Sequence, residues 1–326
     1  MQKKEQKKIF YRISEVQDEV FSIKRQTFEK GHSTGFRCLD ELISYKQGWS
    51  TIIFSYAHQG KTQFVIEECV HLAKAHNVIS AIYLTEAGNR GETILDIIQT
   101  YLGKNLSEHH VDDEDIFKAL EWADKYFILL DNVDNLLSIR DIYSSVKEAE
   151  KQHDIKIGNL VIDHFGNLQR DEDQKFFNIA DNVKYTLQAV TRTSKKFNLH
   201  TFILFHVRDT EPIKCGTTGK YYLPKPEMYA ISGGQQSNFL GQQIISVWRP
   251  VMPYELNETH ITVNKSKPKF IGKLGSAVIY FDTSAQKYYE TIGGEKHYCG
   301  EYTTQHALPS AGIKPNRSFL EDDDIF

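Results

Sequence analysis

The segment between residues 55 and 62 holds the residue types that bind the phosphate chain of a nucleotide. It matches the phosphate-loop pattern G-x-x-x-x-G-K-[ST], except that Ser55 stands at the first glycine. Backbone N–H groups at a helix start hold phosphate oxygens, Lys61 would neutralise the β- and γ-phosphates, and Thr62 would ligate Mg²⁺. The alternative is a chance Gly-Lys-Thr at the start of a helix. The predicted nucleotide-binding residues are Ser55, Tyr56, Ala57, His58, Gln59, Gly60, Lys61 and Thr62.

Three further polar side chains each follow an apolar run of the kind that forms a buried strand. Asp163 ends one such run, about a hundred residues after the phosphate loop, where a carboxylate would hold Mg²⁺ through water. Glu86 follows another run and could orient or deprotonate an attacking water. Because Asp163 is followed by histidine and not by a second acid, Glu86 is the better candidate for the catalytic base. His206 ends a third run and could sense the nucleotide. The alternatives are a turn aspartate, a solvated glutamate and a capping or packing histidine.

Apolar runs alternate with polar-apolar stretches between residues 49 and 206, which predicts a parallel sheet with helices on both faces. Continuous Val, Ile and Leu runs are typical of strands that are buried on both faces. Segment 207–241 is rich in glycine and proline, and three strand-like stretches after it are predicted to extend the sheet. The predicted strands are 50–57, 78–84, 125–131, 159–163, 199–206, 242–249, 259–265 and 276–282, and the predicted helices are 61–76, 92–101, 139–152 and 173–197.

The composition is that of a globular protein and excludes several classes of protein. The chain has 326 residues, 40% hydrophobic and 25% charged, with a formal net charge of −4, so it is not a polycation. A nucleic acid would therefore have to meet a local basic surface. The four cysteines form no C-x-x-C pair, which argues against a disulfide framework or structural zinc and favours a reducing cytosol. The longest apolar runs fall far short of the ~18 residues of a membrane span, so no membrane contact is expected.

Both ends of the chain are expected to be attachments to a central body. Residues 1–30 contain no proline or glycine, and their apolar residues recur at helical spacing, which predicts a basic amphipathic helix that ends near Gly31. The alternative is a helix that packs on its own domain. Residues 291–326 have weak periodicity and are predicted to be a flexible tail. The acidic end of this tail could dock on a partner through Phe326, or it could simply solubilise the chain.

In this order, the phosphate loop, Glu86, Asp163 and His206 resemble the hexameric RecA-like replicative helicases of superfamily 4, the DnaB and phage helicase group. The resemblance implies an α/β fold: a RecA-like P-loop NTPase core with a mostly parallel central sheet flanked by helices, a short N-terminal linker helix and a flexible acidic C-terminal tail. The corresponding divisions are 1–30, 31–290 and 291–326. The segments similar to family motifs are Ser33-Thr34-Gly35-Phe36-x-x-Leu39-Asp40, Leu84-Thr85-Glu86, 161–168, 204–208 and 267–275.

The same resemblance implies roles for several cations. The family's arginine finger, which reaches into the site of the neighbouring subunit, corresponds to Lys269, with Lys265 or Lys267 as alternatives and a basic surface hairpin as the structural explanation. Arg249 would stack on the nucleotide base. Loops after the Asp163 and His206 strands would bind DNA phosphates in the central channel of a ring. The implied DNA-binding residues are Arg170, Lys175, Lys214, Lys220 and Lys225, and the alternative for each is a solvated surface charge.

These motifs predict an NTP-dependent, ring-forming DNA helicase that translocates on single-stranded DNA at a phage or phage-like replication fork, in the host cytoplasm. Catalysis would use Lys61, Glu86 and His206 in cis and Lys269 in trans, with ATP or another NTP or dNTP as substrate. Thr62 and Asp163 would hold Mg²⁺.

As in the family, the N-terminal helix would pack on the adjacent subunit of a hexamer. The acidic tip resembles those of single-stranded-DNA-binding proteins and would contact a polymerase, primase or single-strand-binding protein. Two alternatives remain at this point. One is a RecA-like recombinase or DNA-stimulated ATPase without unwinding, and the other is a non-catalytic replisome accessory module.

Overall fold

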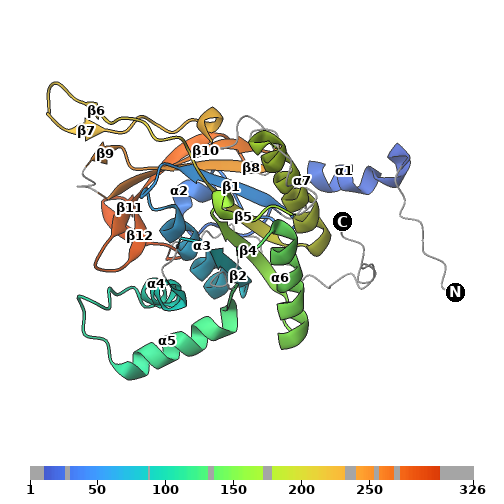
Figure 1. Cartoon of the computed structure of the whole chain (residues 1–326), viewed down its shortest axis with the longest axis horizontal. Coiled ribbons are helices and arrows are strands. Elements are labelled where there is room, and N and C mark those ends of the chain that lie inside the picture. The colour runs from blue at the N-terminus through green and yellow to red at the C-terminus, as the bar shows by residue number, and fades with distance from the viewer. Residues whose placement is uncertain are drawn as a thin grey trace.

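One large sheet connects the two halves of the chain (Figure 1). Among the described residues it has ten strands, in the order β13-β12-β11-β10-β8-β1-β5-β4-β2-β3. Their bounds are β1 (Ser50–Ser55), β2 (Ile79–Leu84), β3 (Phe127–Leu129), β4 (Ile157–Asp163), β5 (His200–His206), β8 (Gln243–Trp248), β10 (Glu258–Ser266), β11 (Gly275–Asp282), β12 (Lys287–Ile292) and β13 (Glu295–Tyr298). The structure is a computed structural model that describes residues 11–25, 30–86, 89–130, 136–171, 178–231, 240–252, 257–267 and 272–301.

The sheet is mostly parallel. β8, β1, β5, β4, β2 and β3 all run in the same direction, and β10 joins β8 as the first antiparallel strand. β11, β12 and β13 continue from β10 as antiparallel neighbours. The predicted α/β class, with a mostly parallel central sheet flanked by helices, is therefore confirmed.

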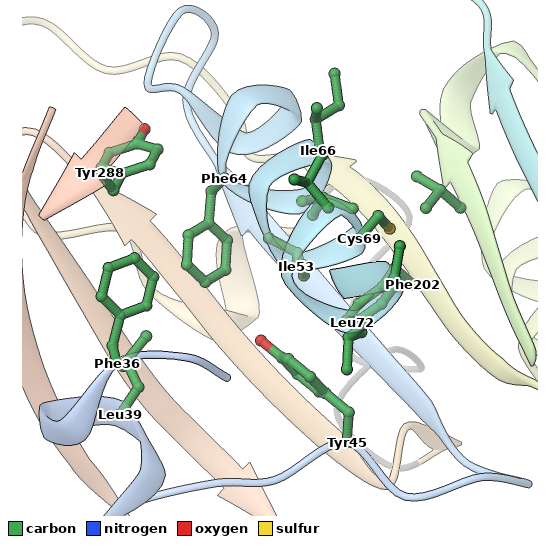
Figure 2. Packing of buried hydrophobic residues seen from close by; sticks show 14 of the residues in the cluster. Phe36, Leu39, Tyr45, Ile53, Phe64, Ile66, Cys69, Leu72, Phe202 and Tyr288 are labelled. Atoms are coloured by element: carbon green, nitrogen blue, oxygen red, sulfur yellow. The ribbon is translucent and has the colours of Figure 1, made fainter. Parts of the chain in front are cut away.

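Helices cover both faces of the sheet, and each face has its own core. α3 (Lys61–His76), α4 (Arg90–Leu102) and α5 (Asp113–Tyr126) contribute to one core, together with the short α2 (Arg37–Asp40). Figure 2 shows this core, where Phe64 of α3 packs near Ile53 and Phe202 of the sheet. α6 (Ile139–His153) and α7 (Ile179–Phe197) cover the opposite face. Successive residues of β1 alternate between the two cores, as the period of a strand requires.

The helix ends follow from local side-chain chemistry. The Ser138 hydroxyl accepts from the backbone N–H of Asp141, and the Asp141 carboxylate accepts from that of Ser138, which forms a capping box at the start of α6. Asn178 caps α7 in the same way through the N–H of Asp181. Predicted helix 173–197 begins later, at Ile179, and its first residues lie outside the described part of the chain.

Two sequence predictions are wrong at their boundaries. Predicted strand 125–131 is reduced to β3, because α5 extends to Tyr126 and buries apolar side chains at helical spacing against the neighbouring elements. The predicted tail does not begin at residue 291, since β12 continues to Ile292 and pairs with β13 in a hairpin. Backbone pairing orders this segment despite its weak side-chain periodicity. Residues 302–326, with the acidic tip, lie outside the described residues.

The N-terminal region contains a shorter helix than predicted. A single 3-10 turn (Ile13–Glu15) precedes α1 (Gln17–Lys24), and residues 1–10 and 26–29 lie outside the described part of the chain. A second small sheet of β6 (Ile213–Lys214), β7 (Tyr221–Tyr222) and β9 (Val251–Met252) extends from the body at the upper left of Figure 1. Every helix in the described ranges is too short or too polar to span a lipid bilayer.

Candidate active site

Four adjacent strands end at the same place. β1, β5, β4 and β2 are neighbours and run parallel, so their carboxyl ends meet at one edge of the sheet. In the register of the sheet, Ser55 pairs with His206 and Leu84 pairs with Asp163. Glu86 follows Leu84 by two residues. Residues predicted from four separate apolar runs therefore share one site.

The phosphate loop joins β1 to α3 and ends at Gly60, the N-cap residue of α3. Gly60 has a φ of 83°, and a Cβ at this position would lie 2.6 Å from the Tyr288 hydroxyl and 2.8 Å from the Arg249 guanidinium. Glycine is therefore required both by the backbone conformation and by the space. Ser55 has no positive φ, and its hydroxyl donates to the Tyr56 carbonyl at 2.6 Å. Serine consequently meets no left-handed strain at the first template position.

Lys61 lies inside the site at the start of α3. Its Nζ is 3.3 Å from the Tyr56 carbonyl oxygen, to which it donates, and 3.4 Å from His206 Nδ1. The side chain is only 5% exposed. Burial lowers the pKa of Lys61, and the carboxylates of Asp163 and Glu86 act in the opposite direction. An ammonium group with so little solvent contact would interact strongly with an incoming phosphate.

Thr62 and Asp163 make a pair that fits Mg²⁺. The Thr62 hydroxyl donates to Asp163 Oδ2 at 2.5 Å. Asp163 is buried, and its Oδ1 has no hydrogen-bond partner within the described residues. Burial raises the pKa of Asp163, while the bond from Thr62 and the charge of Lys61 lower it. A buried, unpartnered carboxylate oxygen beside a hydroxyl offers the hard oxygen donors that Mg²⁺ prefers.

Glu86, His164 and His206 form a compact cluster next to Lys61. Glu86 Oε1 lies 3.0 Å from His164 Nδ1 and 3.3 Å from His206 Nε2. The two imidazole rings meet edge to face, with their centroids 4.5 Å apart. Burial lowers the pKa of His206, and the nearby charge of Lys61 lowers it further. The Glu86 side chain is 52% exposed, so water reaches the candidate base.

Thr85 holds the strand ends together, a role that the sequence analysis did not assign. Its backbone N–H and its hydroxyl both donate to the Asp163 carbonyl oxygen, at 2.7 and 3.1 Å. The Asn167 side-chain amide donates to the Thr85 hydroxyl at 2.9 Å. These bonds join the end of β2 to the end of β4 and thereby set the position of Glu86. A hydroxyl residue directly before the candidate base is the sequence signal that marks it.

Arg249 lies behind the phosphate loop. Its backbone N–H donates to the Gln59 side-chain oxygen at 2.6 Å, and its guanidinium donates to the hydroxyls of Thr259 and Tyr288 at 3.2 and 3.1 Å. Tyr288 in turn donates to the Gly60 carbonyl at 3.3 Å. These contacts attach the phosphate loop to the C-terminal strands, and stacking of Arg249 on a base stays a prediction. Because 228 residues separate Gly60 from Tyr288, no local pattern reveals this contact.

The predicted finger residues are far from this site in the fold. In the register of β10, Lys265 pairs with Ile244 near the start of β8, so Lys265 and the following Lys267 lie at the sheet edge opposite the phosphate loop. Burial, with a smaller effect from Lys267, lowers the pKa of Lys265 to about 8. Lys269 lies outside the described residues.

The predicted DNA-binding cations occupy different degrees of exposure. Lys214 and Lys225 are exposed, while Lys220 and Arg170 are half-buried. Lys175 lies outside the described residues. Lys214 and Lys220 belong to the β6–β7 hairpin, which follows the strand that ends in His206. Their role in DNA binding stays a prediction.

Two solved helicase structures share the fold of this chain. An isolated helicase ATPase domain superposes with a TM-score of 0.66 at 14% identity, over 86% of this chain and 98% of that one. A DnaB-like replicative helicase, solved in a study of its interactions with primase, gives a TM-score of 0.65 at 15% identity, over 86% of this chain and 67% of that one. No protein-family model and no curated protein sequence matches the chain. The similarity shows that the chain has the RecA-like fold of a DnaB-like helicase ATPase domain.

Proposed function

We propose that this chain is an NTP-dependent DNA helicase that forms a ring and translocates along single-stranded DNA at a replication fork. The observation that carries the proposal is the convergence of Lys61, Thr62, Asp163 and Glu86 at one edge of a sheet whose fold is that of helicase ATPase domains. Phosphate binding, metal binding and water activation each have a residue of suitable chemistry there. The convergence argues against the alternative of a non-catalytic accessory module.

The roles of the residues follow from their contacts. Backbone N–H groups at the start of α3 would hold the phosphates together with Lys61. Thr62 and Asp163 would hold Mg²⁺, which supplies neutralisation of phosphate charge when it is bound. Glu86 would orient the attacking water and take its proton. His206 contacts both Lys61 and Glu86, so it would link phosphate binding to the position of the base.

Ring formation is supported by the position of the basic segment that begins at Lys265. A cation at the sheet edge opposite the phosphate loop cannot serve the site of its own chain, whereas it could serve the site of a neighbour. The finger in the proposal is therefore supplied in trans by Lys265, Lys267 or Lys269. A lysine would stabilise transition-state charge as a point charge, without the planar fork of arginine.

The deciding experiment measures NTP hydrolysis with and without single-stranded DNA for the wild type and for Glu86→Gln. Loss of a general base typically costs ~10²–10⁴-fold in rate, so we expect Glu86→Gln to lower DNA-stimulated hydrolysis by that factor. Glu108→Gln removes an exposed carboxylate far along the chain and is the matched control. Unwinding of a forked substrate then separates a helicase from a DNA-stimulated ATPase, and electron micrographs separate rings from filaments. An absence of hydrolysis in the wild type at concentrations where it forms oligomers contradicts the proposal.

A further inference from the structure

The Glu86, His164 and His206 cluster has the geometry of a transition-metal site. One ligand atom from each residue lies within 4.8 Å of the other two, and within the described residues this is the one such group of His, Cys, Asp or Glu side chains. Metal–ligand bonds of about 2.0–2.2 Å place tetrahedral ligand atoms roughly 3.3–3.6 Å apart. The two distances from Glu86 Oε1, 3.0 and 3.3 Å, are close to that spacing. Small rotations of the side chains would complete the site.

The donor types differ from those of the Thr62–Asp163 pair. Two imidazoles and one carboxylate suit zinc and its neighbours in the periodic table, whereas Mg²⁺ prefers oxygen ligands. The imidazoles are 14% and 23% exposed and come from two adjacent strand ends, β4 and β5, so their positions are held by the sheet. Three protein ligands leave a fourth position open to water.

We propose that Glu86, His164 and His206 bind a divalent transition-metal cation of the zinc class, at a site separate from that of Mg²⁺, and that the bound metal inhibits NTP hydrolysis. The inhibitory part rests on the proposed function: Glu86 cannot take a proton from water while its oxygen is ligated to a metal. The binding part rests on the cluster alone.

The contacts of His206 allow the required change of tautomer. Lys61 approaches His206 Nδ1, which leaves Nε2 to carry the proton toward Glu86. A metal at Nε2 moves that proton to Nδ1. Lys61 then no longer donates to His206 but keeps its other partner, the Tyr56 carbonyl oxygen at 3.3 Å. The imidazole stays neutral throughout, as a metal ligand must.

The test is a titration of the tag-free, nucleotide-free protein with Co²⁺ in excess Mg²⁺, followed through the visible ligand-field absorption of four-coordinate Co²⁺. We expect saturation at one Co²⁺ per chain and displacement by Zn²⁺. Since even outer-shell substitutions cost ~10–100-fold in metal affinity, His164→Asn should weaken binding by more than about 10-fold. His110→Asn changes an imidazole that is 92% exposed and should bind as the wild type does. Thermal unfolding without metal shows whether each variant is folded.

An absent absorption signal, or equal affinity in His164→Asn and the wild type, overturns the binding part. The inhibitory part is measured as hydrolysis of Mg²⁺-NTP at buffered free Zn²⁺, where His164→Asn should require more than about 10-fold higher Zn²⁺ for half inhibition. Undiminished hydrolysis by the Zn²⁺-loaded wild type overturns that part. If the chain hydrolyses no NTP, the proposed function fails while the Co²⁺ titration still decides the site. If it hydrolyses NTP but binds no Co²⁺, only the metal site fails.

Discussion

The backbone explains why the phosphate loop tolerates a change at its first template position but not at Gly60. Ser55 ends a buried strand in an ordinary conformation, and its hydroxyl is satisfied by the next carbonyl group. Gly60 has a left-handed φ, and Tyr288 and Arg249 occupy the space that a side chain would need. The pattern is therefore broken at the position where the structure does not depend on glycine.

We expect Gly60→Ala to lower the free energy of unfolding by about 2–3 kcal/mol, from the left-handed backbone and the steric overlap together. Urea denaturation measures this change. Gly216→Ala is the matched control, because a Cβ at Gly216 has no heavy atom within 4 Å among the described residues and φ there is not positive. Its effect should stay within about 0.5 kcal/mol. Equal destabilisation by the two variants would show that the space at Gly60 is not limiting.

Among the helices, α1 leaves its apolar side chains uncovered. None of its eight residues is buried, and Val20, Phe21 and Ile23 are exposed. The short turn before it exposes Ile13 as well. An apolar face that its own chain leaves open is what a helix that packs on a neighbouring subunit needs. This agrees with the role of a linker helix in the proposed ring.

The prediction for α1 is that Phe21→Asp dissociates the oligomer without unfolding the subunit. A charge in the subunit interface carries a large desolvation cost, whereas the same charge on an exposed face of the monomer costs little. Mass photometry at several concentrations measures the oligomeric state, and thermal unfolding measures the subunit. Gln17→Asp introduces the same charge at the first turn of α1, where acidic residues are favoured, and should leave the oligomer intact. An intact ring in Phe21→Asp would place the interface elsewhere.

The β6–β7 hairpin combines charge with aromatic surface. Lys214 lies over the ring of Tyr221 at 5.8 Å from the centroid, and Tyr221 is 48% exposed. Tyr229 is exposed further along the same segment. Lysines that contact phosphates and tyrosines that stack on bases are the common elements of single-strand binding without sequence preference.

We expect Lys214→Ala to weaken binding to a single-stranded oligonucleotide and to reduce the slope of log K against log salt by about 0.7 for each phosphate that the lysine neutralises. Fluorescence anisotropy at several salt concentrations measures both quantities. Lys156→Ala is the control, since Lys156 precedes the first residue of β4, at the sheet edge opposite His206. An unchanged slope in Lys214→Ala would exclude a phosphate contact by this lysine.

Across the molecule, the two halves of the chain meet over buried carboxyl groups. Glu67 of α3 accepts the backbone N–H of Tyr288 in β12 at 2.6 Å, and it is 1% exposed. The neighbouring Glu68 is also buried, and neither of its oxygens has a partner within the described residues. Burial raises the pKa of Glu67 to about 8 and raises that of Glu68 as well. The folded protein therefore holds protons that the unfolded chain releases.

This uptake predicts that stability falls as the pH rises from 6.5 to 8. In that window the unfolded Glu67 is ionised while the folded one is still largely protonated, so each pH unit costs up to about 1.4 kcal/mol. Histidines with lowered pKa values, such as His200 at about 4, act below pH 6.5 and do not compensate. Urea denaturation at pH 6.5 and 8 should show a smaller loss in Glu67→Gln than in the wild type. Glu121→Gln, at an exposed position, should behave as the wild type. A pH dependence that is unchanged in Glu67→Gln would contradict the assignment.

Much of the candidate site could be predicted because its chemistry is local in sequence. The spacing of Gly60, Lys61 and Thr62 marks a helix start, and Asp163 and His206 each end an apolar run. Periodicity was misleading where tertiary contacts decide the element. α5 takes over the start of a predicted strand because its apolar face packs against neighbouring elements, and the β12–β13 hairpin is stabilised by backbone pairing that side-chain patterns do not reveal.

The sequence by itself determined the α/β class, the order of the strands along the chain, and which residues end them. Only the tertiary structure decided which strand ends become neighbours, because the order of strands in a sheet is set by long-range packing and not by the local pattern. That order brings His164 and His206 to the same Glu86 oxygen and places Tyr288 against Gly60. The metal-binding cluster and the support behind the phosphate loop therefore exist only in the folded chain, where residues dozens to hundreds of positions apart come within hydrogen-bonding distance.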